Sequence, residues 1–340
     1  MGRVTKAVAL AAVVGAAVAV APAARRQWRA VQDVEPGFRS PMAYLPLSFG
    51  PRSTQLMRRP TAPADLADGV ALEVLTVPGD GDQPAVEVRV YRPGDRRSDG
   101  ALLWIHGGGY IIGSAAGDDT VASELSARLG VVVVSVDYRL APEHPFPAAH
   151  DDCLHALRWL HAQAGELGVD TARIAVGGES AGGGLAAALV LRAHDDGIPV
   201  CFQYLVYPML DDRTVPRAEA DGTWHVVWSP RSNRYGWASY LGHEPGTGDP
   251  SPYAVPARRV SLAGLPPAWI GVGSVDLFAA EDIEYAERLQ QAGVACELLV
   301  VPGMFHAAQR FSPDHPPAVE FVRSGEAALA AALGSSVAAL

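Results

Sequence analysis

The chain has 340 residues, of which 49% are hydrophobic and 19% are charged, so it can bury a large core and global disorder is excluded. Its formal net charge of −10 argues against nucleic acid, and against a strongly anionic membrane surface, as the main partner, because both attract basic patches. Three widely spaced cysteines without a CxxC pair fit neither a zinc site nor a disulfide framework. We expect Cys153, Cys201 and Cys296 to be buried structural thiols, although the sequence leaves room for one disulfide.

The N-terminus has the features of a targeting segment. A basic start, MGRVTK, is followed by eighteen residues without charge, 7–24, which include an Ala21-Pro22-Ala23 site. This pattern fits a secretory signal peptide, and eighteen apolar residues is the short limit for a spanning helix. We expect residues 1–24 to be a signal peptide or a membrane anchor, which makes the protein secreted or membrane-associated. The alternative is an Ala-rich helix packed on the body of a cytoplasmic protein.

Two different segments precede Gly100. Residues 25–65 combine Arg and Pro with scattered aromatic residues, which indicates an irregular or helical arm. Residues 70–79 and 85–93 then alternate apolar and polar side chains around a Gly/Asp turn. Such alternation predicts an antiparallel hairpin with one solvent-exposed face.

After Gly100 the pattern changes to short apolar runs separated by helical segments. Continuous apolar runs predict strands that are buried on both faces, as in a parallel sheet, and they lie at residues 101–105, 131–136, 173–178, 201–207, 268–273 and 296–301. Helical patterns that end near glycine lie between them, at residues 119–130, 149–163, 180–197 and 279–293. This alternation predicts an α/β fold with a mostly parallel central sheet flanked by helices, and ligands at the carboxyl ends of its strands.

One interval breaks the alternation. From Met209 to about Pro266 no strand is predicted, and the segment holds several Trp and Tyr residues among many Pro and Gly. An insertion of this length inside a compact domain is usually functional.

The strongest chemical signal is VGGESAGGG, residues 176–184, which contains a GxSxG motif centred on Ser180. The motif follows a predicted strand and opens a predicted helix, which is the context of a nucleophile elbow. The glycines leave room for the tight turn, and the helix N-terminus favours negative charge. We therefore interpret Ser180 as a nucleophile, the alternative being a Gly-rich helix start.

A serine nucleophile needs a base, and this architecture places the base after the last strand, with a carboxylate earlier in the chain. Of the ten histidines, only His306 and His315 follow the last predicted strand. His306 lies in a turn directly after that strand and is the predicted base, whereas His315 lies between prolines and is expected in a surface loop. Asp276 follows the preceding strand and is the predicted acid. Glu281 and Asp282 are interpreted as acidic residues in the first turn of a helix.

The run LLWIHGGGYIIG, residues 102–113, ends a predicted strand with three consecutive glycines. Ester hydrolysis passes through an oxyanion that preorganised N–H groups stabilise, and a bulky residue would hold the backbone away from it. Gly108 and Gly109 can present two such N–H groups, and Ala181 can present a third. His106 is expected to orient this loop by hydrogen bonding. A phosphate-binding loop fits poorly, because the run lacks the P-loop lysine and the GxGxxG spacing.

Together these motifs resemble the hormone-sensitive-lipase-like family of α/β-hydrolases, with its bacterial carboxylesterases and arylacetamide deacetylases. The resemblance covers about residues 70–325 and rests on HGGGY (106–110), DYRLAPEHPFPAA (137–149), GESAGG (178–183), SPYAVP (251–256), LPPAWIGVGSVDLF (265–278) and VPGMFH (301–306). Two departures from the family pattern leave every catalytic group in place. GESAG stands where GDSAG is commoner, and Leu277 follows the predicted acid where Pro is frequent.

The resemblance implies an α/β-hydrolase fold with a helical cap. The cap is expected from an N-terminal arm, residues 25–65, and an insertion at about 209–245, on a catalytic domain that spans residues 66–340. The resemblance also implies a catalytic triad and an oxyanion hole, on Ser180, Asp276 and His306 and on Gly108, Gly109 and Ala181. It implies no metal and no organic cofactor.

We therefore expect a serine carboxylesterase that hydrolyses small-molecule esters with short- to medium-chain acyl groups through an acyl-enzyme on Ser180. One alternative is a deacetylase or amidase that uses the same triad. Another is a non-catalytic, ligand-binding member of the fold, against which the presence of all three triad residues argues. The sequence leaves the oligomeric state open.

Overall fold

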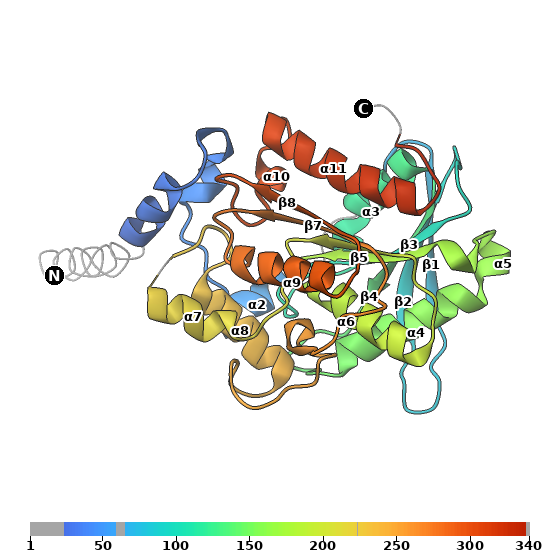
Figure 1. The fold of residues 1–340 in the computed structure, drawn as a ribbon, viewed down its shortest axis with the longest axis horizontal. Helices are drawn as coiled ribbons and strands as arrows, with labels where there is room; N and C mark the ends of the chain where they lie inside the picture. The colour runs from blue at the N-terminus through green and yellow to red at the C-terminus, as the bar shows by residue number, and fades with distance from the viewer. Residues whose placement is uncertain (1–23, 59–64, 223, 338–340) are drawn as a thin grey trace, which may run out of the picture.

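The computed structural model of the chain describes residues 24–58, 65–222 and 224–337, and a single eight-stranded sheet forms its centre (Figure 1). The strands are Val70–Val77 (β1), Val86–Pro93 (β2), Ala101–Ile105 (β3), Val132–Asp137 (β4), Ile174–Glu179 (β5), Phe202–Val206 (β6), Ala268–Gly273 (β7) and Cys296–Val301 (β8). Their order in the sheet is β1-β2-β4-β3-β5-β6-β7-β8. The β1–β2 and β2–β4 pairs are antiparallel, and the pairs from β4 to β8 are parallel.

Each predicted strand is present, with ends that differ by at most two residues, so the prediction of a mostly parallel α/β sheet is confirmed. The strands β3 to β7 are buried along their length, apart from Asp137 and Glu179 at the ends of β4 and β5. The edge strands β1 and β8 are only partly buried. Continuous apolar runs therefore correspond to strands that are covered on both faces.

Helices cover both faces of the sheet (Figure 1). One face carries α3 (Asp119–Leu129) and α11 (Pro316–Ala332), and the other carries α4 (Ala148–Ala162), α6 (Ala181–Asp196) and α9 (Ala279–Gln291). The ends of α3, α4, α6 and α9 match the predicted helices within two residues. The sequence pattern does not predict α11. Much of its inward face is Ala and Gly, which gives a weak hydrophobic period.

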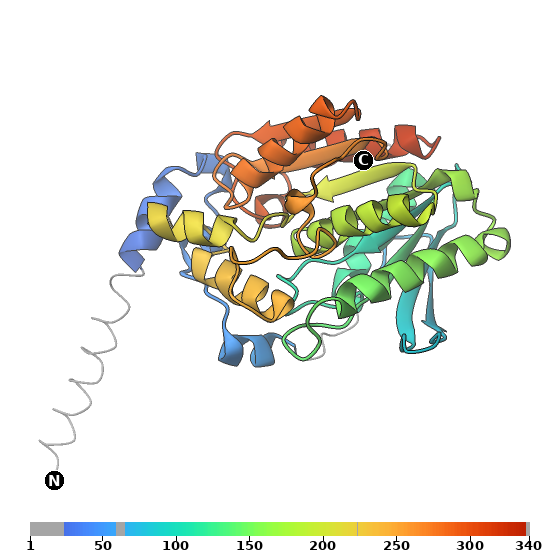
Figure 2. The same ribbon diagram turned by 60° about the horizontal axis from the view of Figure 1, so that its bottom comes forward.

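The N-terminal arm and the insertion pack together at one end of the sheet, as Figures 1 and 2 show. The arm contains α2 (Pro51–Met57), and the insertion contains α7 (Thr214–Asp221) and α8 (Pro230–Leu241). Two hydrogen bonds join them: the indole of Trp224 donates to Gln27 at 2.6 Å, and the N–H of Phe49 donates to the Ser232 hydroxyl at 2.9 Å. Shorter helices complete the fold, at Ala164–Leu167 (α5) and Ala308–Phe311 (α10).

The helix α8 has clear start and stop signals in the sequence. The hydroxyl of Ser229 accepts the N–H of Ser232 as an N-cap, and Pro230 occupies the first helical position. Gly242 ends the helix in a left-handed conformation, with φ 74°. Many Trp, Tyr and Pro residues obscure the helical period of this segment, so the sequence pattern does not predict the helix.

The predicted signal or anchor segment, residues 1–24, lies outside the described residues except for Ala24. Within the described part of the chain, no helix is both long and apolar enough to cross a membrane. All three cysteines are free thiols. Cys153 is buried as expected, but Cys201 and Cys296 are half-buried, because one precedes β6 and the other begins the edge strand β8.

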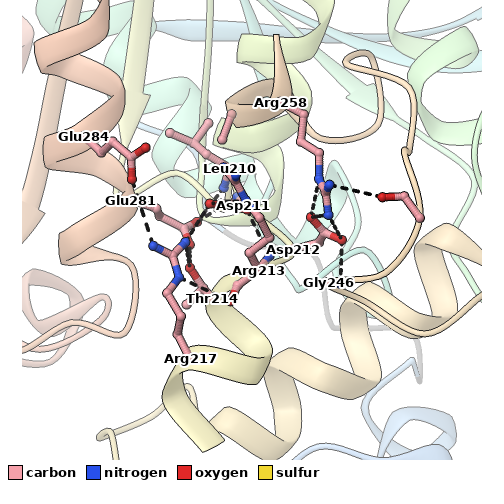
Figure 3. A network of polar contacts seen from close by, with 12 residues as sticks. Leu210, Asp211, Asp212, Arg213, Thr214, Arg217, Gly246, Arg258, Glu281 and Glu284 are labelled. Carbon is pink, nitrogen blue, oxygen red and sulfur yellow. Dashed lines mark hydrogen bonds and ion pairs between the residues drawn. The ribbon is translucent and has the colours of Figure 1, made fainter. Parts of the chain in front are cut away.

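A buried carboxylate connects the body of the protein to the start of the cap insertion (Figure 3). Glu281 of α9 is 2% exposed and accepts hydrogen bonds from the backbone N–H of Leu210, at 2.6 Å, and of Asp211, at 3.2 Å. It also contacts the hydroxyl of Thr214 at the start of α7. Glu281 lies in the first turn of α9, as predicted, and is in addition a buried acceptor for the backbone of the insertion.

Two further carboxylates hold the same connection (Figure 3). Asp211 is 1% exposed and pairs with Arg213, at 2.8 Å, and with Arg217, at 2.6 Å. Asp212 is fully buried and pairs with Arg258 at 2.8 Å, while accepting the N–H of Gly246 at 2.6 Å. Each carboxylate has several donors, as burial of a charge requires.

Asp282, the neighbour of Glu281, also lies in the first turn of α9, as predicted, but lacks such partners. Its side chain is fully buried, and neither carboxyl oxygen has a hydrogen-bond partner among the described residues. Burial, and after it the charges of Glu281 and Asp276, raise the pKa of Asp282 well above its ordinary value. In the pH range between the unfolded and the folded pKa, the folded protein holds a proton here that the unfolded chain releases. Stability must fall as pH rises between the unfolded and the folded pKa.

We expect Asp282→Asn to remove this loss, because an amide does not titrate. As pH rises above about 4, the ordinary pKa of an aspartate, the difference in free energy of unfolding should shift in favour of the variant, by at most about 1.4 kcal/mol per pH unit. Urea denaturation at stepped pH measures this difference. Asp314→Asn changes an exposed carboxylate and serves as the control, with an expected difference that stays flat. A flat difference for Asp282→Asn would mean that the folded protein holds no extra proton at this site.

Candidate active site

Ser180 lies in the turn between β5 and α6 in a strained backbone conformation, with φ 54° and ψ −122°. Hydrogen bonds to the last residue of β6 and to the segment after it hold the turn. The N–H of Ser180 donates to the carbonyl of Val206 at 2.9 Å, and its carbonyl accepts the N–H of Met209 at 2.9 Å. The residue is 7% exposed. This geometry matches the nucleophile elbow that the GxSxG motif predicts.

The glycines on either side of this turn allow a close backbone contact. A Cβ atom on Gly182 would lie 2.1 Å from the carbonyl oxygen of Ile105, and one on Gly178 would lie 2.5 Å from the same oxygen. Contacts this short do not occur, so any larger residue would force the strand and the helix apart. The start of α6 therefore sits directly against the end of β3, and Ser180 comes next to the loop that follows β3.

The structure brings Ser180, His306 and Asp276 together in one hydrogen-bonded chain. The Nε2 atom of His306 lies 2.9 Å from Ser180 Oγ, and its Nδ1 atom lies 2.8 Å from Asp276 Oδ2. A carboxylate accepts hydrogen bonds, so Nδ1 carries the proton and the Nε2 lone pair faces the serine hydroxyl. All three residues are at most 7% exposed.

Neighbouring groups fix this arrangement. The second carboxylate oxygen of Asp276 accepts the N–H of Phe278 at 3.0 Å. The rings of Tyr207 and Phe278 meet the imidazole of His306 edge to face, with centroids 4.7 Å and 5.2 Å away. His306 follows β8 and Asp276 follows β7, so the chain topology brings them to the same edge of the sheet as Ser180.

His315, the other late histidine, lies away from this site. Its Nε2 atom is 2.7 Å from the Glu35 carboxylate, and its ring packs edge to face on Phe38. The residue precedes α11 as its N-cap and is half-buried. His315 therefore lies in the loop before α11, as expected, but the N-terminal arm covers part of its side chain.

The loop after β3 presents free backbone donors. Gly108 and Gly109 have φ values of 123° and 60°, which favour glycine strongly. The N–H groups of Gly108 and Gly109 have no acceptor among the described residues. Ala181 is the first residue of α6, so its N–H has no carbonyl one turn earlier in the helix. These three N–H groups carry the positive end of the local dipoles.

His106 contacts its own loop. Its Nδ1 donates to the carbonyl of Gly107 at 2.8 Å, and its ring stacks on Tyr138 with centroids 4.2 Å apart. The Tyr138 hydroxyl in turn donates to the carbonyl of His106 at 3.0 Å. No group of three His, Cys, Asp or Glu side chains that could hold a metal occurs in the part of the chain that the structure describes.

Sequence reasoning missed an ion pair beside His306. Arg310 of α10 lies 2.6 Å from the Glu179 carboxylate, and it also reaches Asp118 at 3.3 Å. The second oxygen of Glu179 accepts the hydroxyl of Tyr207 at 3.0 Å. The residue before the proposed nucleophile is therefore tied to the segment that carries His306. The only signal in the sequence was the Glu in GESAG.

Comparison with known proteins agrees with this geometry. A family model described as the alpha/beta hydrolase fold matches residues 102–310. Carboxylesterase NlhH of Mycobacterium tuberculosis is 37% identical, over 82% of this chain and 88% of the relative. The solved structure of a bacterial heroin esterase has a TM-score of 0.76 at 42% identity and covers 79% of this chain and 87% of that chain. Gibberellin receptor GID1B of Arabidopsis thaliana is 32% identical, over 58% of this chain and 57% of the relative.

The family model matches more than half of the chain, and the two esterases match most of it. Their named activity agrees with the fold and with the chemistry of the buried site, so the chain is an ester hydrolase of the carboxylesterase class. The predicted family is thereby confirmed. The chain belongs to the hormone-sensitive-lipase-like family of α/β-hydrolases.

Proposed function

We propose that the chain hydrolyses small-molecule carboxylic esters through a covalent acyl-enzyme on Ser180. The observation that carries this proposal is the buried chain of hydrogen bonds from Ser180 through His306 to Asp276. The free N–H groups of Gly108 and Gly109 support it, because an oxyanion needs preorganised donors.

In the proposed acylation step, Ser180 Oγ attacks the ester carbonyl carbon while His306 Nε2 takes the hydroxyl proton. The carbonyl π electrons move to the oxygen, which becomes an oxyanion facing the N–H groups of Gly108, Gly109 and Ala181. Asp276 stabilises the imidazolium that forms. The imidazolium then protonates the leaving alcohol as its C–O bond breaks, and the acyl group stays on Ser180.

Deacylation repeats these steps with water. His306 removes a proton from a water molecule, which attacks the acyl carbon and forms a second oxyanion. Collapse of this intermediate breaks the bond to Ser180 Oγ, and His306 returns the proton to that oxygen. The carboxylic acid leaves, and the free enzyme is regenerated without any cofactor.

The acyl group is proposed to be of short to medium length. Ser180 is 7% exposed beneath the cap, where the rings of Phe49 and Trp228 lie with centroids 5.6 Å apart. Bulky aromatic side chains on this side favour small, apolar acyl groups over large polymers.

Two alternatives rest on the same site. A deacetylase or amidase would use the same three side chains and differ only in the leaving amine. A receptor-like function is suggested by the similarity to the gibberellin receptor, which names a binding protein on this fold. The complete Ser180–His306–Asp276 chain favours turnover over binding alone. Membrane association through residues 7–24 stays a prediction, because those residues except Ala24 lie outside the described part.

Ser180→Ala should lower kcat for 4-nitrophenyl butyrate by about 10,000-fold or more, because the nucleophile is lost while the donors remain. Wild type should give a burst of nitrophenol and a phosphonate adduct on Ser180, seen by mass spectrometry. Turnover that survives in Ser180→Ala would assign the chemistry to another residue. A folded wild type with neither burst nor adduct would favour the receptor-like alternative. Faster turnover of the matched 4-nitroanilide would favour the amidase.

Glu179→Gln should lower kcat several-fold with little change in KM, because Arg310 loses its charged partner and the His306 segment becomes less fixed. It should also reduce the free energy of unfolding by about 1 to 2 kcal/mol, after allowance for the partial exposure of Arg310. Glu320→Gln breaks the exposed pair with Arg323 and serves as the matched control. Equal behaviour of the two variants in kcat and thermal denaturation would contradict the positioning role.

A further inference from the structure

The cap helix α8 packs directly on the oxyanion loop, defined here as residues 106–110. Gly236 faces the loop in the middle of this helix. A Cβ atom on Gly236 would lie 2.8 Å from the carbonyl oxygen of Gly109, which is a backbone atom and cannot rotate away. The helix thus touches the peptide chain of the loop itself, and a glycine is what permits this distance.

Trp228, just before α8, packs against Gly109 at the place where the side chain of any other residue would begin. A Cβ atom on Gly109 would lie 2.1 Å from the six-membered ring of the Trp228 indole. The indole N–H donates to Asn233 Oδ1 at 3.2 Å, and the ring packs against Phe49. Asn233 and Trp228 are 0% and 4% exposed. The indole is therefore held in place by α8 and by the N-terminal arm.

Tyr110 extends the contact to the far end of the loop. Its ring stacks on Tyr240 of α8 with centroids 4.0 Å apart, and Trp237 of the same helix lies 5.3 Å away. The Tyr110 hydroxyl donates to the carbonyl of Met209 at 3.2 Å, where the cap insertion begins. All three rings are at most 1% exposed. One helix therefore covers Gly109 and Tyr110 together.

The loop needs support from outside, because its backbone is strained. Gly108, Gly109 and Tyr110 have positive φ values in succession, of 123°, 60° and 66°. Positive φ is uncommon for a bulky residue such as tyrosine, and it persists only when the surroundings impose it. The turn bonds of the loop itself run from the N–H groups of Ile111 and Ile112 to the carbonyl of Gly108. They leave the orientation of the Gly109 peptide unfixed.

We propose that Gly236 and Trp228 are positioning residues that set the direction of the oxyanion-hole donors, so that the cap is part of the catalytic machinery. The inference rests on the proposed role of the Gly108 and Gly109 N–H groups. The Gly109 carbonyl against α8 and the Gly109 N–H toward the oxyanion belong to adjacent peptide planes that meet at one Cα atom. Displacement of the carbonyl by α8 therefore moves the donor when it shifts this Cα atom.

Gly236→Ala tests this with a single methyl group. Alanine is the better helix former, so α8 itself should gain stability, while the methyl displaces the Gly109 carbonyl. The burst rate constant for 4-nitrophenyl butyrate should fall about tenfold or more, as a misplaced donor approaches the effect of a missing one. The substrate concentration that gives half the maximal burst rate should stay within about twofold of the wild-type value. The inhibition constant of an alkyl trifluoromethyl ketone, whose adduct is an oxyanion, should rise by the same factor as the burst falls.

Gly165→Ala is the matched control. It makes the same substitution in the short helix α5, at an exposed glycine with open space around the added methyl. Its burst rate and inhibition constant should equal those of wild type. Trp228→Phe provides a second test that does not depend on a clash. It removes ring atoms that face Gly109, so the burst rate should fall about threefold to tenfold, again with the half-maximal concentration nearly unchanged.

The outcomes separate the inference from the proposed function. A normal wild-type burst together with Gly236→Ala and Trp228→Phe both within twofold of wild type would overturn the positioning role and leave the function intact. A change in the half-maximal concentration with an unchanged inhibition constant would overturn it too, because it would assign α8 to substrate binding. A wild type that gives no burst and no trifluoromethyl ketone adduct would overturn the proposed function and this inference with it.

Discussion

The start of α6 lies so close to the end of β3 that only backbone atoms fit between them, and the arrangement of the site depends on this contact. Gly182 and Gly178 lie against the carbonyl oxygen of Ile105 at distances that a Cβ atom would reduce to 2.1 Å and 2.5 Å. The contact brings Ser180 beside the oxyanion loop. Any side chain at these two positions would separate the proposed nucleophile from its proposed donors.

Strained backbone conformations occur around the same site, near Ser180 and the oxyanion loop. In the described residues, the non-glycine residues with positive φ are Ser180, Tyr110, Tyr207, Val227 and Ala307. They belong to the elbow, the oxyanion loop, the segment after β6, the cap and the turn after His306. Bonds to other elements hold two of them: the Ser180 N–H donates to the Val206 carbonyl at 2.9 Å, and the Tyr207 N–H donates to the Gly271 carbonyl at 2.7 Å. Part of the packing energy of the fold therefore offsets backbone strain at one site.

The cap also contributes to the geometry of this site. Buried charges attach it to the body of the protein, and its aromatic rings pack on the oxyanion loop. Three buried carboxylates lie where the insertion leaves β6 (Figure 3). Glu281 accepts a backbone N–H group, and Asp211 and Asp212 form ion pairs with arginines. These carboxylates are expensive to bury, and each is matched by several donors. These contacts fix the start of the insertion. Its helix α8 can therefore provide a rigid surface against which the oxyanion loop packs.

Much of this follows from the sequence. Continuous apolar runs marked the strands, because strands covered on both faces contain little else. The motifs at Ser180, Asp276 and His306 marked their side chains, because each directly follows a predicted strand and parallel strands end at one edge of the sheet. The burial of Glu281 and Asp282, the Glu179–Arg310 pair and the contact of Gly236 with Gly109 could not be predicted. Glu281 is 71 residues from Leu210 and Glu179 is 131 residues from Arg310, and no local periodicity relates partners this far apart in the sequence. The chain by itself determined the order of the elements and the chemistry at the strand ends. The tertiary structure decided which distant groups meet, because contacts between separate elements depend on the packing of the whole fold.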